Sequence, residues 1–248
     1  MSRLLASEFR RFRSRRLVKA LVGLELLAIV ATGVIVVLTQ EYDLLGLPDV
    51  LMGTSLVLVS VAWVLGASAI GADWHAGHVT TILTWEPRRG RVMFAKIAAS
   101  LTSVFVVSLV IQALLGAALA AAAAGAGSTA SADAAWLTES AGVALRVALL
   151  STIFAGFGFG LASAGRNTAV ALGVGFGYLV IVENLVRGLR PQWTPWLLTE
   201  NAGLFIVDSP IDFPLLARST IGAGLYLAAV GAVLLLAASG LFRMRDVN

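Results

Sequence analysis

The chain alternates between long apolar blocks and short polar connections. A helix needs about 20 mostly apolar residues to cross the hydrocarbon core of a membrane. Six blocks are long enough, at approximately residues 17–39, 50–72, 92–124, 142–164, 168–186 and 219–241. This pattern predicts an all-α integral membrane protein, with six transmembrane helices in a single transmembrane domain over residues 1–248 and with both termini on the same side.

Composition supports a membrane protein and excludes several other classes. Hydrophobic residues make up 58% of the chain and charged residues only 13%, against about 25% charged residues in a typical soluble domain. Such a chain has too little polar surface for a soluble globular enzyme. It contains no Cys, which excludes disulfides, thiolate metal sites and thiol chemistry.

Basic residues predict the orientation. Seven of the 18 Lys and Arg residues lie within the first 19 positions. They could suggest a nucleic-acid-binding arm, but they directly precede an apolar span, so we expect them to bind anionic membrane lipid and no nucleic acid. Because Lys and Arg concentrate in cytoplasmic segments, we expect cytoplasmic N- and C-termini and a multi-pass location in the inner (plasma) membrane of the cell.

Residues 1–16 are expected to form an amphipathic helix on the cytoplasmic membrane surface. Leu5, Phe9 and Phe12 recur at helical spacing, and Arg3, Arg10 and Arg13 lie elsewhere on the helical wheel. A role as a topology anchor and a role in docking a partner both remain open.

The chain lacks the sequence needed to hydrolyse ATP. A phosphate-binding loop requires G-x-x-x-x-G-K-[ST], and the two lysines, Lys19 and Lys96, follow Val18 and Ala95. We therefore expect no enzymatic activity from this chain and no cofactor bound to it.

The connection over residues 73–91, between spans 2 and 3, mixes apolar residues with fixed charges and contains a helix-stopping Glu86-Pro87 pair. A short amphipathic helix at about 77–85 would present Ile82, Leu83 and Trp85 to something other than lipid. An exposed apolar patch on a cytoplasmic connection predicts a protein partner.

The same connection carries a resemblance to a family. Its spacing of an acidic residue, a glycine, threonines, an apolar residue, a proline and basic residues resembles the first cytoplasmic loop of ABC-2-type transporter permeases: Asp73, Gly77, Thr80, Thr81, Leu83, Pro87, Arg88, Arg89 and Lys96. The six spans, the basic N-terminal helix and the long outer segment at 187–217 are similar to that family as well. The chain departs from it in having Asp73 where Glu is common and His78 where Thr often follows the glycine.

The resemblance implies that the chain is the permease subunit of an ATP-driven ABC exporter. The 73–91 connection would then be a coupling helix seated in a separate ABC ATPase subunit, which would bind ATP and Mg. Two permease chains, identical or related, and two ATPase subunits would form the complex. The residues expected to contact the ATPase are Asp73, Trp74, Gly77, Thr80, Thr81, Ile82, Leu83, Trp85, Glu86, Pro87, Arg88 and Arg89.

Two carboxylates lie inside predicted spans, Glu25 and Glu183. Buried charges in a membrane are costly and generally face protein or a water-filled path, so both are candidates for the translocation path or for a proton site. Hydrogen bonding between helices is the alternative, with Asn184 or Arg187 as partners of Glu183. An ion-gradient-driven secondary transporter or channel using both carboxylates is the alternative function, and a non-transporting membrane anchor is a third.

Two further patterns concern packing and metal binding. Gly156/Gly160 and Gly173/Gly177 are G-x-x-x-G pairs that let helix backbones approach closely. Since spans 1 and 5 line the dimer interface in ABC-2-like permeases, the second pair is a candidate for dimer packing, with packing inside the chain as the alternative. The D-x-H-x-x-H pattern containing His75 and His78 lacks a fourth ligand, so we assign no metal site.

Overall fold

The computed structural model describes residues 2–39, 44–126, 133–209, 213 and 215–244, and these residues form helices and connections with no strand. Most of the Ala/Gly/Ser-rich tract at 125–135 lies outside the described residues.

Six helical segments are long and apolar enough to cross a membrane. The first four begin with α2 (Arg16–Thr39), followed by α3 (Leu47–Gly53) continuing into α4 (Ser55–His75), then α6 (Arg89–Ala126) and α7 (Ala134–Gly165). The fifth comprises α8 (Thr168–Gly177), a π-helical turn (Tyr178–Val182) and α9 (Glu183–Leu189), and the sixth is α11 (Thr220–Met244). The prediction of an all-α chain with six potential spans is confirmed.

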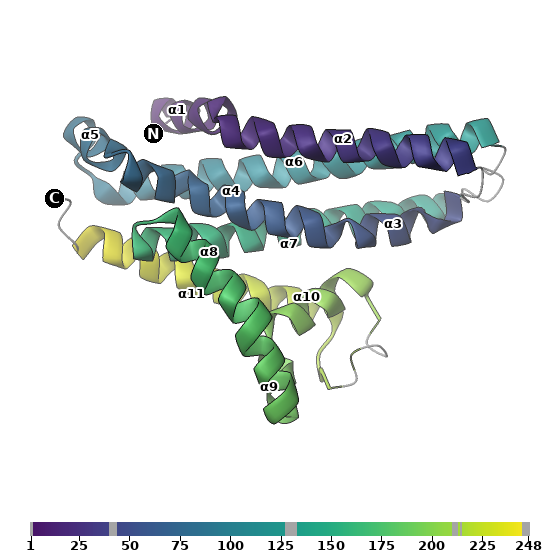
Figure 1. Ribbon diagram of the computed structural model, residues 1–248. Helices are drawn as coiled ribbons and strands as arrows, with labels where there is room; N and C mark the ends of the chain where they lie inside the picture. Colours follow the sequence, from purple (N-terminus) through teal and green to yellow (C-terminus); the bar gives the residue numbers. More distant parts are fainter. Residues whose placement is uncertain (1, 40–43, 127–132, 210–212, 214, 245–248) are drawn as a thin grey trace.

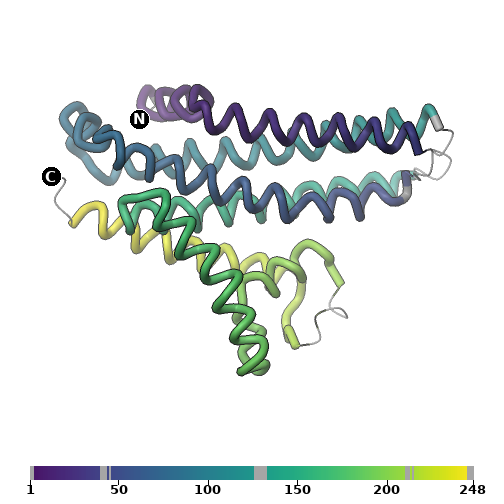
Figure 2. The backbone as a smooth tube through the Cα atoms, in the orientation of Figure 1, coloured from purple at the N-terminus to yellow at the C-terminus, as the bar shows by residue number. Residues whose placement is uncertain are grey.

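The remaining helices are short. They are α1 (Ser2–Ser14), the 3₁₀ turn Leu44–Gly46, α5 (His78–Trp85), the 3₁₀ turn Pro191–Trp196 and α10 (Leu198–Val207). α1 and α5 lie at the same end of the helix bundle (Figures 1 and 2). We call this end the α1–α5 end.

α7 is the central helix. It packs against α4, α6, α8 and α11. In its most apolar stretch, 72% of the residues are buried, against 17% in the corresponding stretches of α2 and of the fifth span. It begins eight residues before the predicted span because the Asp133 side chain accepts a hydrogen bond from Trp136 N (2.8 Å) and caps the first turn.

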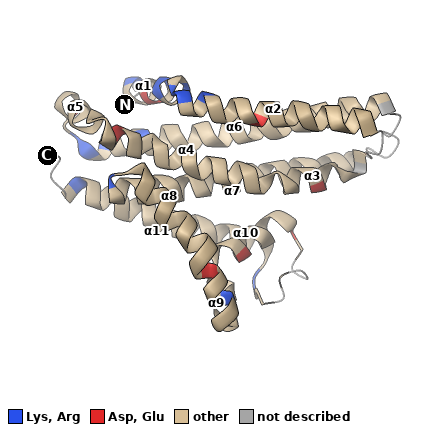
Figure 3. Ribbon diagram, in the orientation of Figure 1, with Lys and Arg blue, Asp and Glu red and all other residues tan. Residues whose placement is uncertain are grey.

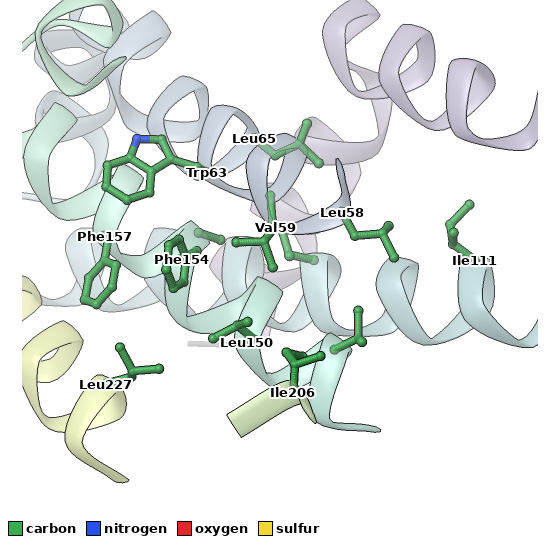
Figure 4. Packing of buried hydrophobic residues seen from close by; sticks show 14 of the residues in the cluster. Leu58, Val59, Trp63, Leu65, Ile111, Leu150, Phe154, Phe157, Ile206 and Leu227 are labelled. Atoms are coloured by element: carbon green, nitrogen blue, oxygen red, sulfur yellow. The ribbon is translucent and has the colours of Figure 1, made fainter. Parts of the chain in front are cut away.

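Close approach of α4 and α7 depends on two glycines. A Cβ on Gly66 would lie 2.0 Å from the carbonyl oxygen of Ala155, and one on Gly158 would lie 2.2 Å from that of Trp63. Beside this contact, Trp63 packs against Phe154 and Phe157 at ring-centroid distances of 5.8 and 6.0 Å (Figure 4). The α4–α7 pair therefore forms the core of the bundle.

The fifth span diverges from the other long helices, so that α9 projects away from the bundle (Figure 1). Its connection to the sixth span, in the long segment at 187–217, includes the Pro191–Trp196 turn and α10. Trp193 and Trp196 are both exposed there.

Candidate partner-docking site

α5 begins and ends where its sequence requires. Gly77 precedes it with φ of +65°, a left-handed conformation that glycine adopts without the cost of a Cβ. At its other end Glu86 is extended, with φ of −128° and ψ of 93°, as expected for a residue before proline. The result is an eight-residue helix set off from α4 and from α6.

α5 has one face packed against the protein and one exposed. Val79 is buried, and Leu83, one turn later, packs against the hydrophobic core. Thr80, Thr81 and Trp85 face away from the chain, and Trp85 is 87% exposed. This corrects the sequence prediction for Leu83, which contributes to the inner face.

The Thr hydroxyls on the outer face are locally engaged. Thr80 Oγ1 donates to Gly77 O (2.5 Å), and Thr84 Oγ1 donates to Thr81 O (2.6 Å). Ile82 is half-buried. The exposed face therefore offers the Trp85 indole ring together with the Thr80 and Thr81 side chains for contact.

The residues that end the connection lie beside α5. Glu86 accepts from Arg88 N (3.3 Å) and lies 3.9 Å from Arg91, while Pro87 and Arg88 are exposed. Arg89 Nη1 donates to Arg243 O at the end of α11 (3.2 Å). Of the predicted contact residues in this stretch, Pro87 and Arg88 are thus the most accessible.

Trp74 and Asp73 occupy positions unlike those predicted for partner contacts. Trp74 packs edge-on against Phe242 of α11, with ring centroids 5.8 Å apart, and Arg166 lies over its ring at 4.8 Å. Asp73 is only 2% exposed. Asp73 therefore offers no free surface to an ATPase, whereas Trp74 is half-buried and keeps part of its surface accessible.

Asp73 is instead the centre of an ionic cluster. Its Oδ1 accepts from Arg15 (2.8 Å) and lies 3.2 Å from Arg11, and its Oδ2 accepts from Lys96 Nζ (2.5 Å). Lys96 also donates to both carboxylate oxygens of Glu8 at 3.1 Å. We call these five residues, Glu8, Arg11, Arg15, Asp73 and Lys96, the α1 clamp.

The α1 clamp joins three helices at the α1–α5 end of the bundle. Glu8 and Arg11 belong to α1, Asp73 lies two residues before the end of α4, and Lys96 is the eighth residue of α6. Arg15, between α1 and α2, also donates to the carbonyl oxygens of Ser68 (2.5 Å) and Ala69 (3.0 Å) on α4. Because α5 contacts α4 and α6, a displacement of α5 that moves these helices would also move α1.

The sequence pattern of the connection includes Asp73 and Lys96 but not their partners near the N-terminus. Glu8, Arg11 and Arg15 are spaced i, i+3 and i+7, which places them on one helical face. The acidic residue on an otherwise basic helix was the available signal. Basic side chains gather at the α1–α5 end (Figure 3).

His75 and His78 lie at the end of α4 and the start of α5, and both are exposed. Asp73, the third member of their sequence pattern, is directed into the α1 clamp. Among the described residues, no group of three His, Asp or Glu side chains is arranged to hold a metal ion.

Glu183 stands at a position that favours structural bonding over a translocation path. Its side chain is fully buried and accepts from Leu198 N (2.7 Å), from Thr199 N (3.2 Å) and from the Thr199 hydroxyl. Arg187 lies 3.6 Å away. The carboxylate thus caps the first turn of α10 and holds it against α9. This arrangement agrees with the alternative interpretation of the sequence, in which Glu183 forms hydrogen bonds between helices.

Glu25 is different, because its carboxylate lacks such bonds. It is 7% exposed, and its Oε1 has no hydrogen-bond partner among the described residues. It lines a cavity of about 140 Å³ between α2, α4 and α6. Of the two carboxylates predicted to line a path, only Glu25 borders an empty space without a bonded partner.

Gly173 and Gly177 lie on a free face of α8. A Cβ built on either would meet no heavy atom of the described residues within 4 Å, whereas one on Gly175 would lie 1.9 Å from the Trp63 ring. Gly175 therefore provides the contact within the chain. The alternative that Gly173 and Gly177 pack inside the chain is not seen, and their surface is open to lipid or to another helix.

Compared with known proteins, the chain matches no protein-family model and no curated protein.

Proposed function

We propose that this chain is the membrane subunit of an ATP-driven exporter and that α5 docks into a separate ATPase subunit. The observation that carries the proposal is the outer face of α5, where an indole that is 87% exposed stands on a short helix outside the helix bundle. A large aromatic side chain with this exposure at a helix end is typical of a binding hot spot.

The position of α5 supports a coupling role. Its inner face is fixed to the core by Val79 and Leu83, and the chain just before it is held by Asp73 in the α1 clamp. A push on the outer face would consequently be transmitted to α4, α6 and α1 together. Coupling of ATP-driven closure to alternating access needs such a mechanical connection.

The remaining parts of the proposal follow from the sequence. The chain has no phosphate-binding loop, so the energy source is a partner that binds ATP and Mg. The α1–α5 end faces the cytoplasm, where basic residues concentrate. A second permease chain packs against the open face of Gly173 and Gly177.

The test is a pull-down of the tagged full chain from native membranes in mild detergent, with Trp85→Ala compared against Trp193→Ala. Both tryptophans are exposed, at 87% and 59%, and they lie on different connections. We expect wild type and Trp193→Ala to recover a P-loop ATPase in near-equal amount. Trp85→Ala should weaken binding of the ATPase by about 25-fold or more and lower its recovery accordingly, since truncating a hot-spot aromatic costs about 2 kcal/mol or more.

Three results would count against the proposal. Equal ATPase recovery by Trp85→Ala and wild type would remove α5 as the docking element. Recovery of the chain without any ATPase, still able to move a solute in liposomes, would favour an ion-gradient-driven transporter. Partner binding without solute flux would favour a membrane anchor.

A further inference from the structure

The cavity beside Glu25 lies in the middle of a predicted span, away from the α1 clamp and from α5. α2 contributes five of its lining residues, and α4 and α6 contribute most of the others, with Thr54 at the start of α4: Leu24, Glu25, Ala28, Ile29, Thr32, Thr54, Val57, Leu58, Val61, Ile111 and Leu115. Leu58 and Ile111 are labelled in Figure 4. Glu25 also borders a smaller cavity toward Ser108.

The lining supplies one carboxylate and no countercharge. No Lys, Arg or His is among the lining residues. The two hydroxyls present are directed elsewhere, since Thr32 donates to Ala28 O (2.9 Å) and Thr54 donates to Leu51 O (2.8 Å). The Oε1 atom of Glu25 is therefore buried without any donor from the described protein.

A charged carboxylate in a membrane segment is costly to bury, so it is either protonated or compensated by a partner. A cation held in the cavity would provide that partner. An ammonium group would donate a charge-assisted hydrogen bond to the free oxygen, which is the stronger class of such bonds.

The size and walls of the cavity define the rest of the ligand. Its volume is about 140 Å³, close to the roughly 150 Å³ of an apolar cavity that accepts benzene. Apart from Glu25 and the two threonines, its walls are aliphatic. A ring or short alkyl body therefore fits beside the carboxylate, whereas a dehydrated inorganic cation would find few oxygen ligands in these walls.

The cavity opens on the side of the bundle. Leu24 and Val57, which belong to its lining, are 61% and 58% exposed. These side chains lie on α2 and α4 respectively, so the opening is between those helices. A compound that partitions into the membrane could enter there without passing through water.

We infer that the Glu25 cavity is a binding site for a small lipophilic amine, with Glu25 binding its ammonium group and the aliphatic walls binding its apolar body. As a substrate site this inference rests on the proposed export function. The binding itself requires only this chain, so the two can fail separately.

The test measures binding of 2-phenylethylamine to the full chain in nanodiscs of zwitterionic lipid, with 2-phenylethanol as the neutral analogue. We expect the amine to bind at least about tenfold more tightly than the alcohol, because a charge-assisted hydrogen bond contributes more binding free energy than a neutral one. Glu25→Gln keeps the side-chain shape and removes the charge, and it should abolish that preference. Glu139→Gln, at an exposed carboxylate on α7, should leave it unchanged.

A second variant guards against misfolding of Glu25→Gln. Ala28→Leu keeps the carboxylate and fills the cavity, so it should weaken binding of both compounds. Equal binding of amine and alcohol by wild type, or an unchanged preference in Glu25→Gln, would overturn the inference. Amine binding that Ala28→Leu leaves intact would also overturn it. Because no ATPase is present, any of these results would leave the docking role of α5 standing.

Discussion

At the scale of single residues, the α1 clamp shows how charges are kept in the interior of an apolar chain. Two carboxylates, Glu8 and Asp73, are matched by Lys96, Arg11 and Arg15, and Asp73 and Lys96 are each 2% exposed. Breaking a buried ion pair by removing one member is strongly destabilising, because it leaves the other charges without compensation. Asp73 contacts all three cations, so its loss should be the most costly.

We therefore predict that Asp73→Asn lowers the free energy of unfolding by about 3 kcal/mol or more. The matched control is Arg91→Met, which removes a half-exposed partner 3.9 Å from Glu86 and should cost less than about 1 kcal/mol. Denaturation of the detergent-solubilised chain, followed by circular dichroism, measures both. Similar small losses in the two variants would show that the clamp does not stabilise the fold.

The sequence indicates that Asp73 has a functional or structural role, but it does not indicate that this role is an ionic cluster with α1 and α6. Asp73 and Lys96 were recognised from their spacing around the connection, yet a linear pattern does not say whether a carboxylate faces a partner or its own protein. That depended on α1 folding back against α4 and α6. The role of Glu183 is equally hard to predict from the sequence. Its hydrogen-bond donors, Leu198 and Thr199, follow a proline-containing turn whose path the sequence does not determine.

At the scale of helices, apolar length predicted the six spans well, because length and composition are properties of each helix alone. Which faces pack was harder to predict. Gly156 and Gly160 form a G-x-x-x-G pair, and they lie against Leu235 and Leu234 of α11. The closest backbone approach uses Gly66 and Gly158, which form no such pair within their own helices and are matched only across the interface.

This assignment predicts opposite effects for two glycines on α7. Gly158→Ala should lower the free energy of unfolding by about 1–3 kcal/mol, because its methyl group would force α4 and α7 apart. Gly142→Ala, on the same helix with open space around it, should be neutral or stabilising by up to about 1 kcal/mol. The same denaturation experiment compares them. A loss of equal size in both variants would contradict close packing at Gly158.

At the scale of the whole molecule, the two least buried spans are the first and the fifth. α8 directs Gly175 toward Trp63 and leaves Gly173 and Gly177 on the opposite, open face. Either lipid or another helix could cover that face. Two neighbouring small residues favour a helix, because they let its backbone approach closely, whereas lipid tails gain nothing from small residues. The proposed dimer accordingly places this face near a two-fold axis.

A residue near a two-fold axis lies close to its own copy, which makes the dimer testable by a single cysteine. The chain contains no cysteine, so Gly173→Cys introduces the only thiol. Under mild oxidation in native membranes we expect a disulfide-linked dimer, since Cβ atoms about 4 Å apart can be bridged. Val233→Cys, on the exposed surface of α11, should remain monomeric.

The mass of the cross-linked product decides between the possible partners. A species of twice the chain mass identifies a homodimer. If the second permease is a related chain, Gly173→Cys gives no self-linked product, and a bifunctional thiol-to-amine reagent should link it to that other chain instead. Absence of both products, while the ATPase is still recovered with the chain, would show that Gly173 and Gly177 face lipid and that the permeases meet through another surface.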